Sequence, residues 1–251
     1  MVGCRSYLRA IILAGGYARR MWPVTRDTPK PLLPVAGRPA IDHILDKVRE
    51  VDVTEIIIST NLKFRDQFQT WLNERKGGNA KIVAEASVSE KGKLGAVGAL
   101  LRLTEVIEPD DYLVLAGDNL FTASLTGMTA LYDQIRKPIV AVYDLKDVEQ
   151  VRTGSAVTLG RDMRILRFEE KPKHPETNTI GACMYIFPYR TLLRTRDYVN
   201  QGGKKDEPGN FVAWLCASEI VYAYKPGGIL WDIGTKEEYE RTKRQFSKTN
   251  V

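Results

Sequence analysis

The sequence predicts an α/β protein with a Rossmann-like, mainly parallel mixed sheet and helices on both faces. Three observations support this fold class. Short apolar runs rich in β-branched residues alternate with amphipathic segments through the first half of the chain. The first run, residues 10–14, ends abruptly in Gly15-Gly16, as a strand buried on both faces does at a sharp turn. After about residue 150 the strand-like runs follow one another with little helix between them, so the later strands join the same sheet.

Each element follows from the spacing of its apolar residues. Strands are expected at residues 10–14, 55–60, 81–84, 112–116 and 139–143, and later at 155–159, 164–170 and 180–187. Helices are expected at residues 41–50, 63–76, 95–107 and 125–136. Four residues of the second helix share one face and mark its buried side: Phe64, Phe68, Trp71 and Leu72.

Composition excludes several classes of protein. No apolar run approaches the roughly 18 residues of a membrane span, and the N-terminus lacks the apolar region of a signal peptide, so we expect a cytoplasmic protein with no membrane partner. The net charge of +6 is spread among acidic residues, which argues against a nucleic-acid partner. Cys4, Cys183 and Cys216 have neither disulfide nor metal-ligand spacing, so reduced thiols are expected.

The segment after the first strand has the composition of an anion-binding loop. Glycines let successive backbone N–H groups approach a ligand, and Arg19, Arg20 and Lys30 add fixed positive charge beside them. This combination indicates a bound triphosphate, and the alternative is an ordinary turn with solvated basic residues. Neither G-x-G-x-x-G nor G-x-x-x-x-G-K-[ST] is present, which excludes the dinucleotide fingerprint and the Walker loop.

The loop opens a longer pattern that resembles the sugar-1-phosphate nucleotidyltransferases, also called nucleotide-sugar pyrophosphorylases. The family pattern G-G-x-G-T-R-L-x-P-L-T corresponds to residues 15–25, P-K-P-L-L-P-V to residues 29–35 and G-K-P to residues 37–39. Ala18 and Arg19 stand where the family has glycine and threonine.

The resemblance extends from residue 9 to about residue 240. It implies a single domain over residues 1–251, with a nucleotide-binding part at about 1–145, a sugar-binding part at about 146–235 and no C-terminal β-helix domain. A homo-oligomer, either a dimer or a tetramer, is also expected.

The reaction that the resemblance implies is in-line attack of a sugar 1-phosphate on the α-phosphate of a nucleoside triphosphate, with release of pyrophosphate. Arg20 is expected to neutralise the β- and γ-phosphates, and Lys30 the α-phosphate and the attacking oxygen. The nucleotide is expected to lie against the backbone of the loop and of two later glycine turns, at Leu13, Ala14, Gly15, Gly16, Gly95 and Gly117.

Two aspartates are candidate ligands of a Mg²⁺ cofactor. Asp118 follows Gly117 at the carboxyl end of a predicted parallel strand, where open sheets bind ligands, and is expected to contact the nucleotide as well as the metal. The alternative is a turn or cap residue. Asp232 lies in Trp231-Asp232-Ile233-Gly234-Thr235, which resembles the family segment W-x-D-x-G-T and so implies the second carboxylate. Thr235 also suits the N-cap of a last helix.

Sugar and base recognition are assigned by resemblance. Glu169-Glu170-Lys171-Pro172 is similar to the family's E-E-K-P, in which the second glutamate binds sugar hydroxyls and the lysine binds the sugar phosphate. Asn178 matches the family's sugar-binding asparagine, and Cys183 stands where a glycine is common.

The base reader is the least defined residue of the pattern. Glu90 stands five residues before Gly95, where several uridylyl and thymidylyl enzymes have a glutamine. A carboxylate only accepts hydrogen bonds, which suits guanine or the cytosine amino group. An exposed loop residue is the alternative for Glu90.

The sequence is compatible with several activities. Gly-Asp-Asn-Leu-Phe favours glucose 1-phosphate with dTTP or UTP, whereas Ala182-Cys183-Met184-Tyr185 is nearer to mannose-1-phosphate guanylyltransferases. A cytidylyltransferase acting on choline phosphate is a further alternative, as is a catalytically inactive regulatory subunit that senses nucleotide sugars. The polar stretch at residues 199–209 is expected to be a mobile surface loop, or else a lid.

Overall fold

The computed structural model describes residues 7–75, 78–146 and 148–249. Cys4 and the predicted end of the second helix at residue 76 lie outside these ranges. The main sheet is built around the parallel strands β1 (Leu8–Leu13), β4 (Val53–Asn61), β5 (Ala80–Glu85) and β6 (Asp111–Ala116). These strands lie in the order β6-β1-β4-β5, which brings their carboxyl ends to one edge.

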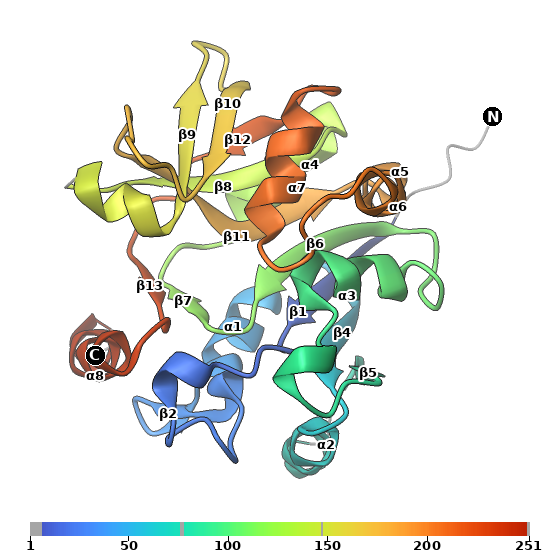
Figure 1. The fold of residues 1–251 in the computed structure, drawn as a ribbon, viewed down its shortest axis with the longest axis vertical. Helices are drawn as coiled ribbons and strands as arrows, with labels where there is room; N and C mark the ends of the chain where they lie inside the picture. The colour runs from blue at the N-terminus through green and yellow to red at the C-terminus, as the bar shows by residue number, and fades with distance from the viewer. Residues whose placement is uncertain (1–6, 76–77, 147, 250–251) are drawn as a thin grey trace.

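The antiparallel strand β11 (Thr179–Phe187) extends this sheet and divides it. One edge of β11 pairs with β6 through Met184–Phe187 and with β9 (Ser155–Leu159) through Ile180 and Gly181. Its other edge pairs with β8 (Ile139–Asp144), and β8 in turn pairs with β12 (Tyr222–Tyr224). Beyond β9 lies β10 (Ile165–Glu170), so β9 and β10 form a separate wing in the upper part of Figure 1.

Helices cover both faces of the sheet, as predicted, and alternate residues of the strands point to the two layers. One face is covered by α1 (Ala40–Val48), α2 (Arg65–Glu74), α4 (Thr126–Ile135) and α8 (Lys236–Thr249). The other is covered by α3 (Gly95–Leu103), α5 (Tyr189–Leu193), α6 (Thr195–Asn200) and α7 (Pro208–Cys216). In β1, for example, Ile12 packs in the first layer and Ile11 in the second. Figure 1 shows α1 and α3 on opposite sides of β1.

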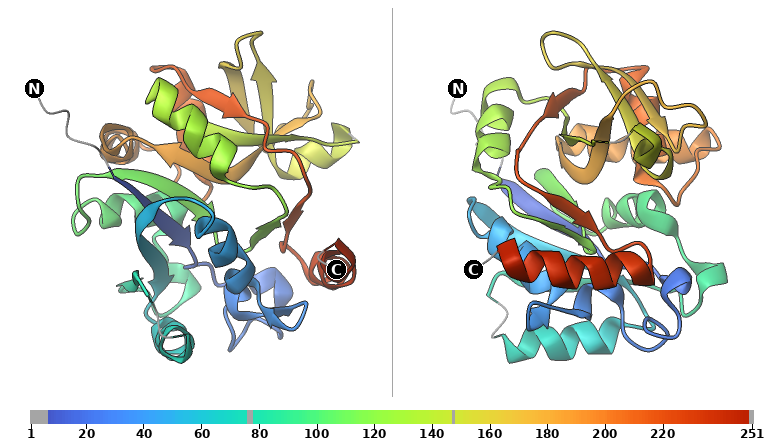
Figure 2. Two further views of the ribbon diagram at one scale, coloured as in Figure 1. Left: turned by 180° about the vertical axis from the view of Figure 1, so that it is seen from behind. Right: turned by 90° about the vertical axis from the view of Figure 1, so that its left-hand side faces the viewer.

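A small antiparallel ribbon joins distant parts of the chain below the wing. In it, β7 (Asn119–Phe121) pairs with β13 (Leu230–Asp232), with Asn119 opposite Asp232. The chain then enters α8, whose Tyr239 hydroxyl donates to the Pro34 carbonyl at 2.8 Å. Figure 2 shows α8 lying across the N-terminal segment that contains β2 (Pro34–Val35) and β3 (Arg38–Pro39). The ribbon and α8 therefore tie the C-terminal region to the N-terminal half.

Most predicted elements are present, with differences at their ends. The predicted helix at residues 95–107 stops at Leu103, and the strand at 55–60 extends to Val53–Asn61. The predicted last helix is present as α8. Thr235 caps it as predicted, because the Glu238 N–H donates to the Thr235 hydroxyl at 3.1 Å. Helices α5, α6 and α7 were not predicted. Residues 201–207, predicted as part of a mobile loop, are held by hydrogen bonds to α3 and α6.

Candidate active site

The glycine loop leaves β1 at the carboxyl edge of the sheet and is fixed there by β4. Asn61 Nδ2 donates to the Gly15 carbonyl at 3.0 Å, and the Ala14 N–H donates to the Ser59 carbonyl at 2.7 Å. Nothing lies within 4 Å of the place where a Gly16 side chain would begin, so this part of the loop faces open space. The loop then turns through the 3₁₀ segment η1 (Arg19–Met21), which contains Arg20.

Ala18, which stands where the family pattern has glycine, adopts a backbone conformation that favours glycine. Its φ of 49° is in the left-handed region, and the Thr25 hydroxyl donates to its carbonyl at 2.8 Å. Arg19, the second departure, lies 5.4 Å from the Trp22 ring centre, and Arg26 lies 5.5 Å from the same ring. The two replacements therefore leave the turn intact while the Arg19 guanidinium packs against Trp22.

Lys30 reaches the end of β6 because Gly117 leaves room for the Pro-Lys-Pro segment. A Cβ on Gly117 would lie 2.9 Å from Pro31 Cγ and 3.0 Å from the Leu13 carbonyl oxygen. With glycine there, the segment η2 (Lys30–Leu32) packs close to the strand, and Lys30 Nζ pairs with Asp118 Oδ2 at 3.0 Å. Burial disfavours the ammonium, but the charges of Asp118 and Asp232 outweigh it and hold the pKa of Lys30 above its usual value.

The ribbon brings Asp232 beside Asp118. The Ile233 N–H donates to the Asp118 carbonyl at 3.2 Å, and Asp232 ends β13 opposite Asn119. Asp232 is open to solvent on one side but closely surrounded by protein on the others. This burial, with the negative charge of Asp118 next in importance, raises the pKa of Asp232 to about 7. Lys30, Asp118 and Asp232 are thus brought together from three separate segments.

Glu238, in the first turn of α8, also faces this cluster. A Cβ on Gly234 would lie 2.7 Å from Glu238 Oε2 and 3.4 Å from Asp232 Oδ2, so the two carboxylates flank Gly234. The charge of Glu238 raises the pKa of Asp232, and that of Arg20 lowers it. The sequence offers one signal for this position of Glu238. Glu238 stands three residues after the N-cap Thr235, a spacing that turns its side chain back toward the end of β13.

The predicted sugar-binding pair lies at the end of β10. Glu170 accepts a hydrogen bond from the Ser155 hydroxyl, and burial raises the pKa of Glu170 above its usual value. Lys171 has a φ of 49°, an uncommon value for a residue with a side chain, and its ammonium pairs with Glu207 Oε1 at 2.7 Å. Strained backbone of this kind gathers at functional sites.

Cys183 lies between this pair and the aspartates. Burial, followed by the negative charge of Asp118, raises the pKa of the Cys183 thiol to about 12, with smaller effects of Asp232 and Glu170. The buried Tyr185 hydroxyl is hydrogen-bonded to this thiol. The side chain is therefore a neutral thiol inside the predicted site, where a glycine would leave more space.

Two other predicted residues lie apart from these contacts. Asn178 is exposed, and its Nδ2 donates to the Leu145 carbonyl at 2.9 Å, which ties the start of β11 to the end of β8. Glu90 pairs with Lys93 at 2.8 Å in the 3₁₀ segment η3 (Glu90–Gly92). Neither residue forms a hydrogen bond to Asp118 or Glu170 within the described part of the chain, so their assigned roles remain predictions.

A second carboxylate, which was not predicted, lies between the glycine loop and the start of α3. Glu85, the last residue of β5, is buried, and its Oε1 accepts from the Ser87 hydroxyl at 2.6 Å. Ser87 in turn is hydrogen-bonded to Tyr17 of the glycine loop at 3.1 Å, and the Leu94 N–H points to Glu85 from the start of α3. Glu85 ends β5 and Glu90 lies in the connection to α3, so both carboxylates precede Gly95.

The two aspartates fit a hard divalent cation. Both offer carboxylate oxygens, the ligands that Mg²⁺ prefers, at the same corner of the sheet. No group of three or more potential ligand side chains forms a cage in residues 7–75, 78–146 and 148–249. A two-carboxylate site of this kind would leave the remaining positions to phosphate oxygens and water.

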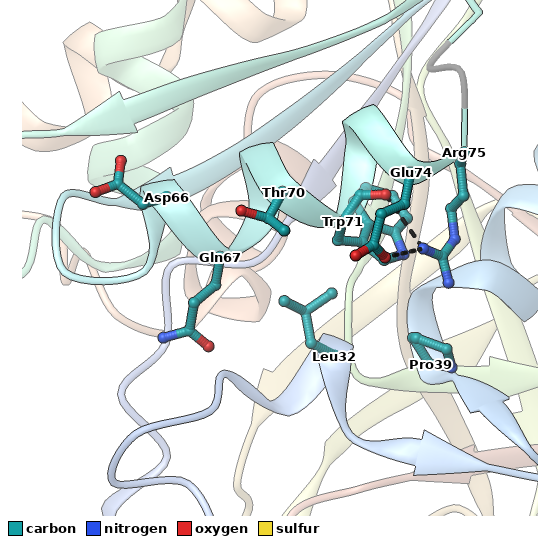
Figure 3. Close-up of a pocket in the computed structure, with 8 residues that line it drawn as sticks. All are labelled: Leu32, Pro39, Asp66, Gln67, Thr70, Trp71, Glu74 and Arg75. Carbon is teal, nitrogen blue, oxygen red and sulfur yellow. Dashed lines mark hydrogen bonds and ion pairs between the residues drawn. The ribbon is translucent and has the colours of Figure 1, made fainter.

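A surface hollow of about 460 Å³ lies elsewhere, against α2. Figure 3 shows Leu32 and Pro39 at its floor and the polar side chains of α2 along its rim. None of the predicted site residues lines it.

The fold is that of an α/β protein whose candidate site residues gather at the strand ends. A family model described as nucleotidyl transferase matches residues 9–249, and the chain belongs to this family. In the helices of the described residues, no stretch is both long and apolar enough to cross a membrane.

Individual relatives differ in the reaction for which they are named. The chain is 27% identical over 237 residues to mannose-1-phosphate guanylyltransferase of Mycobacterium tuberculosis, covering 92% of this chain but only 62% of that protein. It is 29% identical over 244 residues to D-glycero-alpha-D-manno-heptose 1-phosphate guanylyltransferase of Aneurinibacillus thermoaerophilus, covering 95% and 98%. A UDP-glucose pyrophosphorylase solved with UDP-glucose shares the fold, with a TM-score of 0.80, 20% identity and coverage of 97% and 99%.

Proposed function

We propose that this chain transfers a nucleotidyl group from a nucleoside triphosphate to a sugar 1-phosphate, releasing pyrophosphate and forming a nucleoside-diphosphate sugar. The observation that carries this proposal is the meeting of Lys30, Asp118 and Asp232 at the carboxyl edge of the sheet, beside a glycine loop that faces open space. Ligands of open α/β sheets bind at this edge.

The proposed mechanism depends on positioning and charge. An oxygen of the sugar phosphate forms a bond to the α-phosphorus while the bond from that phosphorus to the pyrophosphate oxygen breaks. The attacking oxygen is already anionic, so no general base is required. Lys30 neutralises the α-phosphate and Arg20 the departing phosphates. Mg²⁺ held by Asp118 and Asp232 would supply further neutralisation of the phosphate oxygens.

The sugar 1-phosphate is proposed to lie between the aspartates and the end of β10. Glu170 would accept hydrogen bonds from sugar hydroxyls and Lys171 would contact the phosphate. Asn178 is retained as a proposed sugar ligand, although reaching the sugar would require its side chain to leave the Leu145 carbonyl.

For the base we propose guanine, read by Glu85. Guanine presents N1–H and N2–H₂ side by side, and a buried carboxylate can accept from them, whereas uracil and thymine present a donor between two acceptors. Guanylyltransferases among the relatives support this choice. Glucose 1-phosphate with dTTP or UTP, favoured by the Gly-Asp-Asn-Leu-Phe segment, is the competing substrate pair.

Pyrophosphate release with each nucleoside triphosphate, tested against a panel of hexose and heptose 1-phosphates, decides between these activities. We expect release with GTP, and we expect Glu85→Gln to shift the preference toward UTP or dTTP by about 10- to 100-fold, since hydrogen bonds to a charged group are strong. Glu90→Gln is the matched control and should leave the preference unchanged.

Other outcomes assign the chain differently. Tight nucleotide-sugar binding without release from any pair would identify a regulatory subunit, and release confined to CTP with choline phosphate would identify a cytidylyltransferase. A dimer or tetramer is also proposed, and light scattering of the purified protein measures it.

A further inference from the structure

The segment at residues 204–209, here called the strap, lies between the two proposed substrate regions. Two neighbouring acidic residues of the strap pair with one lysine from each region. Asp206 Oδ2 lies 3.4 Å from Lys93 Nζ, which precedes α3 on the nucleotide side. Glu207 Oε1 lies 2.7 Å from Lys171 Nζ on the sugar-phosphate side.

Glycines allow the strap to pack closely at both ends. A Cβ on Gly95 would lie 2.4 Å from the Lys205 carbonyl oxygen, and the Val97 N–H donates to that oxygen at 2.8 Å. At the other end, a Cβ on Gly209 would overlap the Glu170 carboxylate. Tyr198 holds the middle through a hydrogen bond from its hydroxyl to the Lys204 carbonyl at 3.0 Å. The strap is thus a fixed bridge, and its carboxylates have defined positions.

We propose that Glu207 is the anion that occupies Lys171 in the substrate-free protein and that the phosphate of the incoming sugar 1-phosphate displaces it. This inference rests on the proposed role of Lys171 in sugar-phosphate binding. Glu207 is then a positioning residue that holds the ammonium at the site and also sets the affinity for the phosphate.

The charges decide the direction of the exchange. The Lys171 side chain is 43% exposed and the Glu207 side chain 34%, so their pair is weak enough to open. A phosphate close to a double negative charge attracts the ammonium more strongly than one carboxylate does, and it repels Glu207. Lys171 lowers the pKa of Glu207, so Glu207 stays ionised and competes throughout the neutral range.

Calorimetric binding of a hexose 1-phosphate and of inorganic phosphate, without nucleotide, tests this exchange. We expect Glu207→Gln to lower the dissociation constant for both ligands about three- to fivefold, because the competing charge is removed. Binding of the uncharged sugar should not change. In a Lys171→Met background the Glu207→Gln substitution should have no effect, since the group under competition is absent.

Asp206→Asn is the matched control, because it removes the same charge from the neighbouring position but faces Lys93. An equal gain in phosphate affinity in this variant would show a general charge effect and overturn the proposal. Weaker binding in Glu207→Gln, or no phosphate binding in either wild type or variant, would also overturn it. Absence of pyrophosphate release from every substrate pair would instead contradict the proposed function and leave the calorimetric result valid.

Discussion

Lys30 is the residue whose contacts give the most direct support to the proposed reaction. It is mostly buried, carries an ammonium held by Asp118, and lies next to the open side of the glycine loop. We expect Lys30→Ala to lower kcat by at least about a hundredfold, because charge stabilisation at a reacting centre is worth several factors of ten. Steady-state kinetics measure the fall in kcat, and circular dichroism checks that the variant is folded. A folded variant with wild-type turnover would remove Lys30 from the site.

Asp232 should make the metal-free protein less stable as the pH rises. Its pKa is raised from 3.8 to about 7 in the folded state, so between these values the folded protein holds a proton that the unfolded chain has released. Stability therefore falls with increasing pH across this window. In chelator, Asp232→Asn should have a Tm about 2–4 °C above wild type at about pH 8, and the gain should shrink toward about pH 4. A gain that is independent of pH would contradict this assignment.

At this scale the sequence predicted side chains next to strong local signals and missed those defined by neighbours distant in sequence. Asp118 could be placed because it follows a glycine at a strand end. Glu85 could not be proposed, because its burial beside Tyr17 of the glycine loop, through Ser87, depends on contacts between distant parts of the chain. Similarly, Ala18 reads as a departure from the family loop, yet the hydrogen bond from Thr25 keeps its left-handed turn.

Among the elements, the turn after β6 has a steric requirement that bears directly on Lys30. Gly117→Ala would place a methyl group 2.9 Å from Pro31 Cγ, which forces the segment bearing Lys30 away from Asp118. We expect a loss of about 1–3 kcal/mol in unfolding free energy and a fall in kcat of about a hundredfold. Chemical denaturation and kinetics measure these changes. Gly16→Ala is the control for stability, since no atom lies within 4 Å of its Cβ position, and equal destabilisation in both variants would refute the steric argument.

Helices and strands could be predicted where apolar residues form a long continuous or periodic run. Short elements, and strands that pair with distant segments, could not. The strands of the parallel core are continuous apolar runs and were placed within two residues of their ends. By contrast, α5 and α6 are short and follow one another directly, so neither shows a full helical repeat. The pairing of β7 with β13 depends on strands of three residues far apart in the chain, which local patterns do not reveal.

For the molecule as a whole, a group of largely buried ion pairs lies at the end of the sheet opposite to the proposed site. At the amino end of β1, Arg9 pairs with Glu55 and Asp110, each at 2.7 Å, with all three side chains largely buried. Arg9→Gln leaves two carboxylates without their shared cation, so we expect a loss of about 1–2 kcal/mol in unfolding free energy with unchanged kcat. The exposed pair Arg102–Glu105 is the control, and Arg102→Gln should change stability by less than about 0.5 kcal/mol. A large fall in kcat for Arg9→Gln at a temperature where the variant stays folded would contradict this separation.

The ribbon formed by β7 and β13 also sets when, during synthesis of the chain, the two proposed metal ligands Asp118 and Asp232 can come together. Translation delivers the glycine loop, Lys30 and Asp118 with the strands of the parallel core, and those strands can fold as they leave the ribosome. Asp232 arrives only with β13, after all the strands of the main sheet. A growing chain would therefore carry the glycine loop with only one of the two proposed metal ligands, and we expect it to be inactive until β13 pairs with β7.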